Sequence, residues 1–187
     1  LTFMLSVLVP YMLTTELSPL LEKSADSRVI NTSSYMHHFA KVKDLDFGFE
    51  KEYSPSLAYN NSKLYSIWMT RYLARKFFLN GSSITVNSYH PGLIATNLVN
   101  NSNTKPTKKS VLGRTMKPIP KSLDEGIETG YYLSLSEEIS GLTGYYFDDK
   151  TVKTVAEKGY TFEKAQALIT YCNEKIELFK QKHALLN

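Results

Sequence analysis

The chain opens with a run of apolar residues from Leu1 to Leu13, and its first charged residue is Glu16. A run of about 10 to 14 apolar residues is usually a buried core helix, whereas a membrane span needs about 20. A signal peptide would carry a basic region ahead of its apolar run, and none is present here. The pattern therefore predicts a buried helix cut from a longer protein.

Three later segments have the composition of short buried strands. Each is rich in β-branched or aromatic residues and is bounded by residues that favour turns. The first ends in hydroxyl side chains, and the second is broken by a His-Pro-Gly sequence. The three segments are 28–34 (RVINTSS), 83–89 (SITVNSY) and 144–148 (GYYFD).

A long helix is expected between the first two strands. Ser54 and Pro55 suit an N-cap and a first helical position, and Gly81 suits a C-terminal stop. The helix should therefore run from about Pro55 to Phe78. Apolar residues recur along it at helical spacing and should form its buried stripe. These residues are Leu64, Ile67, Trp68 and Leu73.

Two more helices are expected in the second half of the chain. Ser122 and Glu125 form a capping-box pair ahead of a helix that continues through about Glu137. A last helix, from about residue 162 to 182, has one apolar face, made of Ala165, Leu168, Ile169, Cys172, Ile176 and Phe179. Helices that alternate with short strands, without an internal repeat, predict an α/β protein.

Composition narrows the class of protein without naming its chemistry. With 187 residues, 42% of them hydrophobic and 21% charged, the chain is suited to one globular domain. The net charge of +4 is spread along the chain without interleaved aromatic residues, so nucleic acid is not an expected partner. The single cysteine, Cys172, excludes an internal disulfide and a thiolate-rich metal site. We expect it to be a buried apolar residue in a reducing compartment.

A tyrosine followed four residues later by a lysine places a phenol and an ammonium about 6 Å apart along one helix face. The nearby cation stabilises the phenolate and brings the phenol closer to the pH at which it can exchange a proton with an alcohol or a carbonyl. The same spacing recurs along this chain, so spacing alone has little weight. It occurs at Tyr59, Tyr72, Tyr146, Tyr160 and Tyr171.

Context favours Tyr59 and Lys63 among these pairs. They lie near the start of a helix that follows a strand ending in Ser34 and precedes a strand ending in His-Pro-Gly. Ligands of α/β sheets bind beyond the carboxyl ends of the strands, which is where these residues must fall. Tyr72 lies thirteen residues further along the same helix and therefore faces away from Tyr59.

The segments RVINTSS, SLAYNNSKL and VNSYHPGLIATNL have the order and spacing found in short-chain dehydrogenases/reductases. The chain resembles that family from about Leu5 through the last helix, and most of all its retinol-dehydrogenase-like and WW-domain-containing oxidoreductase-like branch. The resemblance implies a partial Rossmann-like, doubly wound parallel sheet, the C-terminal half of the family's fold. It also implies that residues 1–187 form one domain that lacks its amino-terminal part.

The resemblance assigns roles to individual residues. Ser34 is similar to the catalytic serine, which also binds the substrate oxygen. Tyr59 is similar to the acid/base that contacts both substrate and cofactor, and Lys63 to the residue that polarises it and holds the nicotinamide ribose. The segment that seats the nicotinamide carboxamide and a nearby phosphate corresponds to Pro91, Gly92, Ile94 and Thr96.

Two features depart from the family pattern. The family's opening helix begins with an asparagine that contributes to a proton relay, and Ser6 occupies that position here. The glycine-rich turn that receives the cofactor pyrophosphate would lie before Leu1, and no GxGxxG or GxxxGxG occurs in the chain. We therefore expect this chain alone to be inactive and not to bind the dinucleotide.

The remaining polar clusters have simpler interpretations. His37 and His38 are adjacent and lack the spacing of helical metal ligands, so we expect loop residues and no metal site. His90 is expected to shape the turn before Pro91. The basic stretch from Lys105 to Lys121 is expected to be a solvated loop, with a substrate lid or a contact with an anionic membrane as alternatives.

The expected activity is hydride transfer between NADP or NAD, with NADP favoured by the family branch, and the carbonyl or alcohol carbon of a small lipophilic substrate. A cytoplasmic location, or the cytosolic face of an intracellular membrane, fits this activity. Peripheral membrane contact and a homodimer stay open as interactions. The alternative is a non-catalytic scaffold derived from a dehydrogenase, which acts by protein interaction. The presence of Ser34, Tyr59 and Lys63 together argues against that alternative.

Overall fold

The computed structural model describes residues 1–42, 45–92, 94, 121–155 and 159–184. The described strands form one sheet in the order β1-β2-β3-β4, with bounds Arg28–Thr32, Thr85–Tyr89, Tyr146–Asp148 and Thr151–Val152. β1, β2 and β3 are parallel, with Ile30 opposite Asn87 and Ser88 opposite Tyr146. The short β4 is antiparallel to β3 and was not predicted from the sequence.

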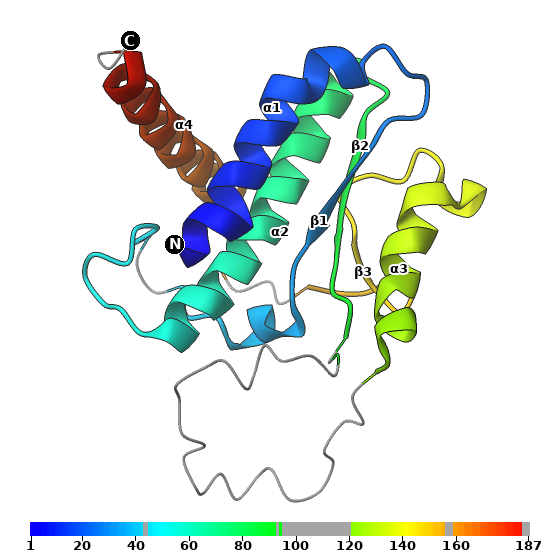
Figure 1. Cartoon of the computed structure of the whole chain (residues 1–187), viewed down its shortest axis with the longest axis horizontal. Coiled ribbons are helices and arrows are strands. Elements are labelled where there is room, and N and C mark those ends of the chain that lie inside the picture. The colour runs from blue at the N-terminus through cyan, green and yellow to red at the C-terminus, as the bar shows by residue number, and fades with distance from the viewer. Residues whose placement is uncertain (43–44, 93, 95–120, 156–158, 185–187) are drawn as a thin grey trace, which may run out of the picture.

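Helices cover both faces of the sheet, which confirms the predicted α/β class. In Figure 1 the sheet is seen nearly edge-on, with α1 (Val9–Leu21) and α2 (Pro55–Leu79) on one side and α3 (Leu123–Leu135) on the other. α2 contacts both β1 and β2, and α3 contacts β1. α4 (Phe162–Ala184) packs against α2. The connections between parallel strands therefore alternate between the two faces, as in a doubly wound fold.

The predicted opening helix is present, but it is buried on one face only. A π-helical turn, Met4–Leu8, leads into α1, and Val7 and Tyr11 point into the core. Tyr11 also donates a hydrogen bond of 2.9 Å to Asn173 Oδ1 on α4. The outer face of α1 carries exposed apolar side chains, so the expectation of a buried helix is met on one face only. The segment Met4–Leu21 is long and apolar enough to cross a membrane, by length and composition alone.

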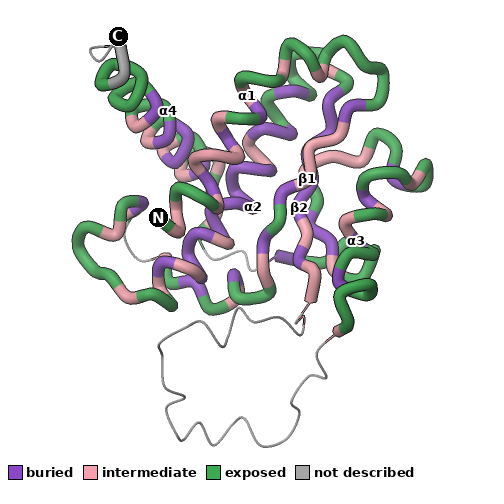
Figure 2. The backbone as a smooth tube through the Cα atoms, viewed as in Figure 1, coloured by how far each residue is buried: buried purple, intermediate pink, exposed green. Residues whose placement is uncertain are grey.

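α2 begins and ends where its local signals predict. Ser54 accepts a hydrogen bond of 3.2 Å from the Leu57 amide as the N-cap, and Gly81 adopts a φ of +71° just beyond the C-terminal end. Burial is broader than the predicted stripe, because the sheet, α4 and the η2 segment (Tyr35–Phe39) all pack on this helix. Figure 2 shows buried residues along most of α2 and β2.

The predicted capping box of α3 is present, with Ser122 and Glu125 each bonding the other's backbone. The predicted apolar face of α4 is buried from Ala165 to Ile176. Phe179 is 57% exposed, so the prediction that it is buried with this face is wrong. The next residue, Lys180, forms an ion pair of 3.0 Å with Glu16 on α1.

Two apolar clusters hold the layers together. The larger lies between the sheet and the helices α1, α2 and α4, and Trp68 and Tyr65 are its largest fully buried side chains. The smaller lies on the α3 side and consists of Leu133, Ile139 and Phe147. Within the described residues β1 pairs on one edge only, with β2. A parallel sheet is normally paired along both edges of such a strand, so β1 carries an open edge.

Candidate active site

The polar residues that follow β1 and β2 meet at one edge of the sheet, because parallel strands end on the same side. Ser33 and Ser34 follow β1, and His90 to Gly92 follow β2. The Ser33 amide donates a hydrogen bond of 2.6 Å to the Tyr89 carbonyl oxygen, so strand pairing continues one residue past β1. The predicted convergence of these two segments is present in the structure.

Lys63 joins α2 to the end of β1. Its Nζ atom donates a hydrogen bond of 3.0 Å to the Thr32 carbonyl oxygen. In the opposite direction, Ser33 Oγ donates a hydrogen bond of 2.8 Å to the backbone carbonyl oxygen of Lys63. Ser33 is buried and Lys63 is half-buried. These two bonds fix the third turn of α2 against the strand end.

Tyr59 lies one turn before Lys63 on the same face of α2. The Lys63 Nζ atom is 5.7 Å from the centroid of the Tyr59 ring. Burial lowers the pKa of the Lys63 ammonium, because its charged form loses contact with water. The ammonium has three N–H groups, and the Thr32 carbonyl takes one of them. Lys63 can therefore hold a second acceptor while it remains bound to the strand.

Ser34 caps the short η2 helix. Its Oγ accepts a hydrogen bond of 3.2 Å from the Met36 amide, and the residue is half-buried. A hydroxyl can both accept and donate, and no described residue accepts the Ser34 O–H. Ser34 and Tyr59 do not hydrogen-bond each other, so both hydroxyl groups keep a donor for a third molecule.

The other tyrosine–lysine pairs lie elsewhere. The Tyr72 ring stacks on Phe162, with centroids 5.6 Å apart and an interplanar angle of 14°, as expected for a side chain that faces away from Tyr59. Tyr146 is buried, and Lys150 pairs instead with Glu128 at 2.7 Å. Tyr171 contacts Phe3 and Phe47 between α4 and the start of the chain. Only the pair at Tyr59 adjoins the carboxyl end of β1.

The segment after β2 turns at Gly92, whose φ is +86°. Ile94 forms a single parallel bridge with Lys121. Thr96, the last residue of the predicted cofactor seat, lies outside the described residues, as does most of the basic stretch that ends at Lys121. Lys121 itself pairs with Asp149, which raises the pKa of the lysine and lowers that of the carboxyl group.

Comparisons with known proteins place this geometry in a family. No family model matches the chain. Retinol dehydrogenase 12 from Homo sapiens is 37% identical over 139 residues, which cover 74% of this chain and 42% of that protein. Short-chain dehydrogenase TIC 32 B, chloroplastic, from Brassica napus is 34% identical over 136 residues, which cover 71% of this chain and 42% of that protein. The chain belongs to the short-chain dehydrogenase/reductase family.

A solved structure shares the fold of this short-chain dehydrogenase/reductase chain. NADPH-bound carbonyl reductase from chicken fatty liver matches it with a TM-score of 0.53 at 21% identity, over 82% of this chain and 55% of that one. Identity at that level shows the fold alone. The matched residues span only 42% of the length of each of the two curated relatives above.

One residue of this short-chain dehydrogenase/reductase chain that the motifs do not point to is Gly126 in α3. A Cβ atom on Gly126 would lie 2.3 Å from Ile94 Cδ1, so the glycine makes room for a residue of the predicted cofactor seat. The available signal was a glycine inside a predicted helix, which often marks a close approach of another segment.

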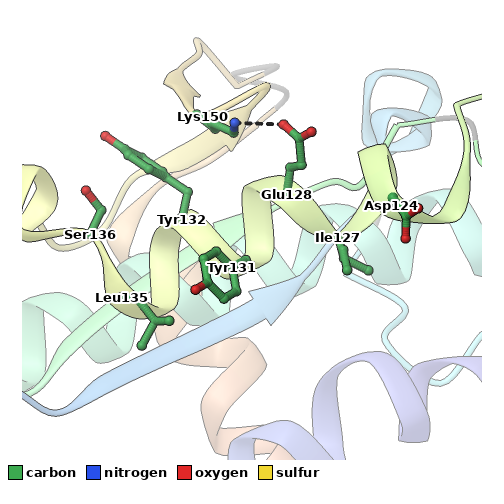
Figure 3. A pocket seen from close by; sticks show the side chains of 8 residues that line it. All are labelled: Asp124, Ile127, Glu128, Tyr131, Tyr132, Leu135, Ser136 and Lys150. Carbon is green, nitrogen blue, oxygen red and sulfur yellow. Dashed lines mark ion pairs between the residues drawn. The ribbon is translucent and has the colours of Figure 1, made fainter.

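A cavity of about 610 Å³ lies on α3, and Figure 3 shows the side chains that line it. Ile127, Tyr131 and Leu135 line it, and the Glu128–Lys150 ion pair crosses one side. None of the predicted site residues lines this cavity. Among the described residues, no three His, Cys, Asp or Glu side chains gather as metal ligands would.

Proposed function

We propose that the protein that contains this chain is an oxidoreductase. It transfers a hydride between a nicotinamide dinucleotide and the carbonyl or alcohol carbon of a small lipophilic molecule. One observation carries the proposal: Lys63 is held by Thr32 at the strand end while its ammonium lies beside Tyr59. Partial burial of an ammonium that bonds only one carbonyl has a desolvation cost, and a non-catalytic scaffold would gain nothing from it.

The hydroxyl groups of Ser34 and Tyr59 have different roles when a carbonyl substrate is reduced. Ser34 donates its free O–H to the carbonyl oxygen of the substrate, which increases the positive character of the carbonyl carbon. Tyr59 then donates its proton to that oxygen, and Lys63 stabilises the phenolate that remains. The dinucleotide supplies the hydride when it is bound.

The residues present fit one end of such a cofactor. Lys63 has N–H groups to spare for the ribose hydroxyls, and Gly92 lacks a side chain where the chain turns with positive φ. Pro91, Gly92, Ile94 and Thr96 would hold the nicotinamide carboxamide and a nearby phosphate. NADP or NAD would both fit, with NADP favoured by the family branch and by the NADPH bound to the chicken reductase.

The other end of the cofactor requires residues that are not among these 187. A glycine-rich turn at a helix N-terminus supplies most pyrophosphate contacts in doubly wound folds, and the sequence contains none. This chain alone is therefore expected to be inactive, and the activity belongs to the whole protein. The names of the relatives favour a retinoid or a similar lipophilic alcohol or aldehyde as substrate.

The test uses the whole protein and measures the reduction of retinal and of small aldehydes with NADPH and NADH. The wild type should turn over, and Tyr59→Phe should lower kcat by about a hundredfold or more, because it loses only the proton donor. Tyr72→Phe is the matched control and should stay near wild type, since that ring stacks on Phe162. A wild type that binds the cofactor without turnover would favour the scaffold alternative. An active Tyr59→Phe variant would remove Tyr59 from the mechanism.

A further inference from the structure

His90, the residue that follows β2, is held on three sides. It is 8% exposed, and its ring lies 6.0 Å from that of Tyr35 on η2 and 6.0 Å from that of Tyr146 on β3, the latter nearly parallel at 15°. Its backbone amide donates a hydrogen bond of 3.2 Å to the Phe147 carbonyl oxygen, which extends the pairing of β2 with β3 by one residue. Few orientations are open to a ring packed in this way.

Both nitrogen atoms of the His90 ring have a defined environment. The Gly92 amide donates a hydrogen bond of 3.0 Å to Nδ1, so Nδ1 must be the unprotonated, accepting nitrogen. Nε2 lies 3.0 Å from Asp148 Oδ1, although its N–H is not aligned well enough for a hydrogen bond. A carboxylate at that distance favours a proton on Nε2. The two neighbours therefore select the same tautomer.

The hydrogen bond to His90 Nδ1 comes from Gly92, the residue of this turn with the greatest backbone freedom. Glycine at a φ of +86° can readily adopt other backbone conformations, and the Gly92 amide can form this bond only in a narrow range of them. The same turn leads to Ile94, which is fixed in turn by its bridge to Lys121. The ring of His90 thus constrains the backbone at Pro91 and Gly92.

We propose that His90 is a positioning residue for the cofactor: its Nε2-protonated ring holds the Gly92 turn in the shape that receives the nicotinamide carboxamide. This inference rests on the proposed function. His90 is not a general base, because its one free lone pair is already bonded to the Gly92 amide. Asp148 acts one step further away, by keeping the ring proton on Nε2.

Two substitutions separate the two nitrogen positions. In His90→Asn the side-chain oxygen takes the place of Nδ1 and can still accept from Gly92, whereas in His90→Gln the amide reaches the place of Nε2 and leaves Gly92 without an acceptor. In the whole protein, we expect His90→Asn to keep the cofactor KM within about twofold of wild type. His90→Gln should raise it by about five- to tenfold, as for one lost hydrogen bond. The KM of the carbonyl substrate should be unchanged in both. Equal cofactor KM values for the two variants would overturn the proposal.

A second measurement needs no turnover, and it uses a variant only to assign the His90 signal. In ¹⁵N spectra of the histidine rings of the whole protein, His90 should show the neutral Nε2–H tautomer, with its signal assigned by its loss in His90→Asn. A proton on Nδ1 would overturn the proposal whatever the kinetics. If the wild type shows no dinucleotide-dependent turnover while the Nε2–H tautomer is found, the proposed function fails and the structural part of this inference stands.

Discussion

The Nζ atom of Lys63 and the carbonyl oxygen of Thr32 are 3.0 Å apart, and this hydrogen bond ties the middle of a helix to the end of a strand. Ser33 is the next residue after Thr32, and its Oγ donates a hydrogen bond of 2.8 Å to the Lys63 carbonyl oxygen. Tyr59 lies one turn earlier on that helix, so the bonds between Lys63 and the end of β1 help to set its position. The proposed chemistry therefore depends on a serine and a threonine that need not touch any substrate.

Alanine substitutions of the neighbouring residues Ser33 and Ser34 should separate an effect on stability from an effect on catalysis. Ser33→Ala removes a buried hydrogen bond and should lower the free energy of unfolding by about 1 kcal/mol. Its effect on kcat should be less than about threefold, since Lys63 keeps its bond to Thr32. Urea unfolding and steady-state kinetics of the whole protein measure both quantities.

Ser34→Ala should show the opposite pattern. The half-buried hydroxyl caps only a short helix, so the free energy of unfolding should change by less than about 1 kcal/mol. Loss of one donor to the substrate oxygen should lower kcat by about a hundredfold. If Ser33→Ala lost activity and Ser34→Ala kept it, the serine assignment would have to move by one residue.

Gly126 and Ile94 should be energetically coupled. An alanine at position 126 would place its Cβ 2.3 Å from Ile94 Cδ1, so Gly126→Ala should destabilise the protein by about 1–3 kcal/mol. When Ile94→Ala removes the obstructing atoms, the same substitution should become neutral or stabilising by up to about 1 kcal/mol, because alanine favours a helix over glycine. A double-mutant cycle from urea unfolding measures the coupling. Additive changes would show that Ile94 moves aside freely.

Alkaline pH should lower the free energy of unfolding of the protein. Burial raises the pKa of Cys172 from 9.0 to about 12 and that of Tyr65 from 10.0 to about 12. The native state then holds protons that the unfolded chain has released, so stability falls as the pH rises above about 9. Lys63, whose pKa is lowered, acts in the opposite direction.

Cys172→Ala isolates one contribution to this pH dependence. The slope of unfolding free energy against pH, measured in urea between about pH 9 and 11, should become shallower by up to about 1.4 kcal/mol per pH unit. The variant will also be less stable at neutral pH because a buried side chain is shortened, but that change is independent of pH. A slope equal to that of the wild type would mean that the thiol titrates normally.

Ser6 offers a test of the proton relay implied by the family resemblance. It lies half-buried in the π-helical turn Met4–Leu8. An asparagine there has both a donor and an acceptor and a longer reach than serine. Ser6→Asn should raise kcat of the whole protein by about twofold or more. Ser18→Asn, in the last turns of α1, is the control and should leave kcat unchanged.

The sequence predicted those parts of the fold that depend on adjacent residues. Ser54, Pro55 and Gly81 marked the ends of α2 correctly, because caps and positive-φ stops act within one turn of the chain. The second strand was predicted to end at Tyr89 and does so, whereas the first ends at Thr32, two residues before its predicted end at Ser34. The meeting of the two strand ends at one edge followed from parallel pairing.

What the sequence could not supply depends on segments far apart in the chain. Phe179 follows Ile176 by three residues on α4, yet its side chain is 57% exposed, and helical spacing alone does not show where burial of a helix face ends. The fit of Gly126 to Ile94 joins a helix to a turn more than thirty residues earlier, and no local pattern records it. The acceptor role of His90 likewise requires the backbone geometry of Gly92. These relations arise only when the layers of the fold assemble.

Because α2 is buried on nearly all sides, few amino-acid substitutions can be tolerated along it. From residue 60 to 70, about three turns, every side chain except Lys63 is buried. Several of these are polar and already committed: Thr70 Oγ1, for example, accepts from Asn31 on β1 and donates to the Ser66 carbonyl oxygen. A replacement of Asn61, Ser66 or Thr70 must therefore match both a volume and a hydrogen-bonding partner. Related chains should consequently diverge least along this stretch, and most along the solvent-facing side of α4.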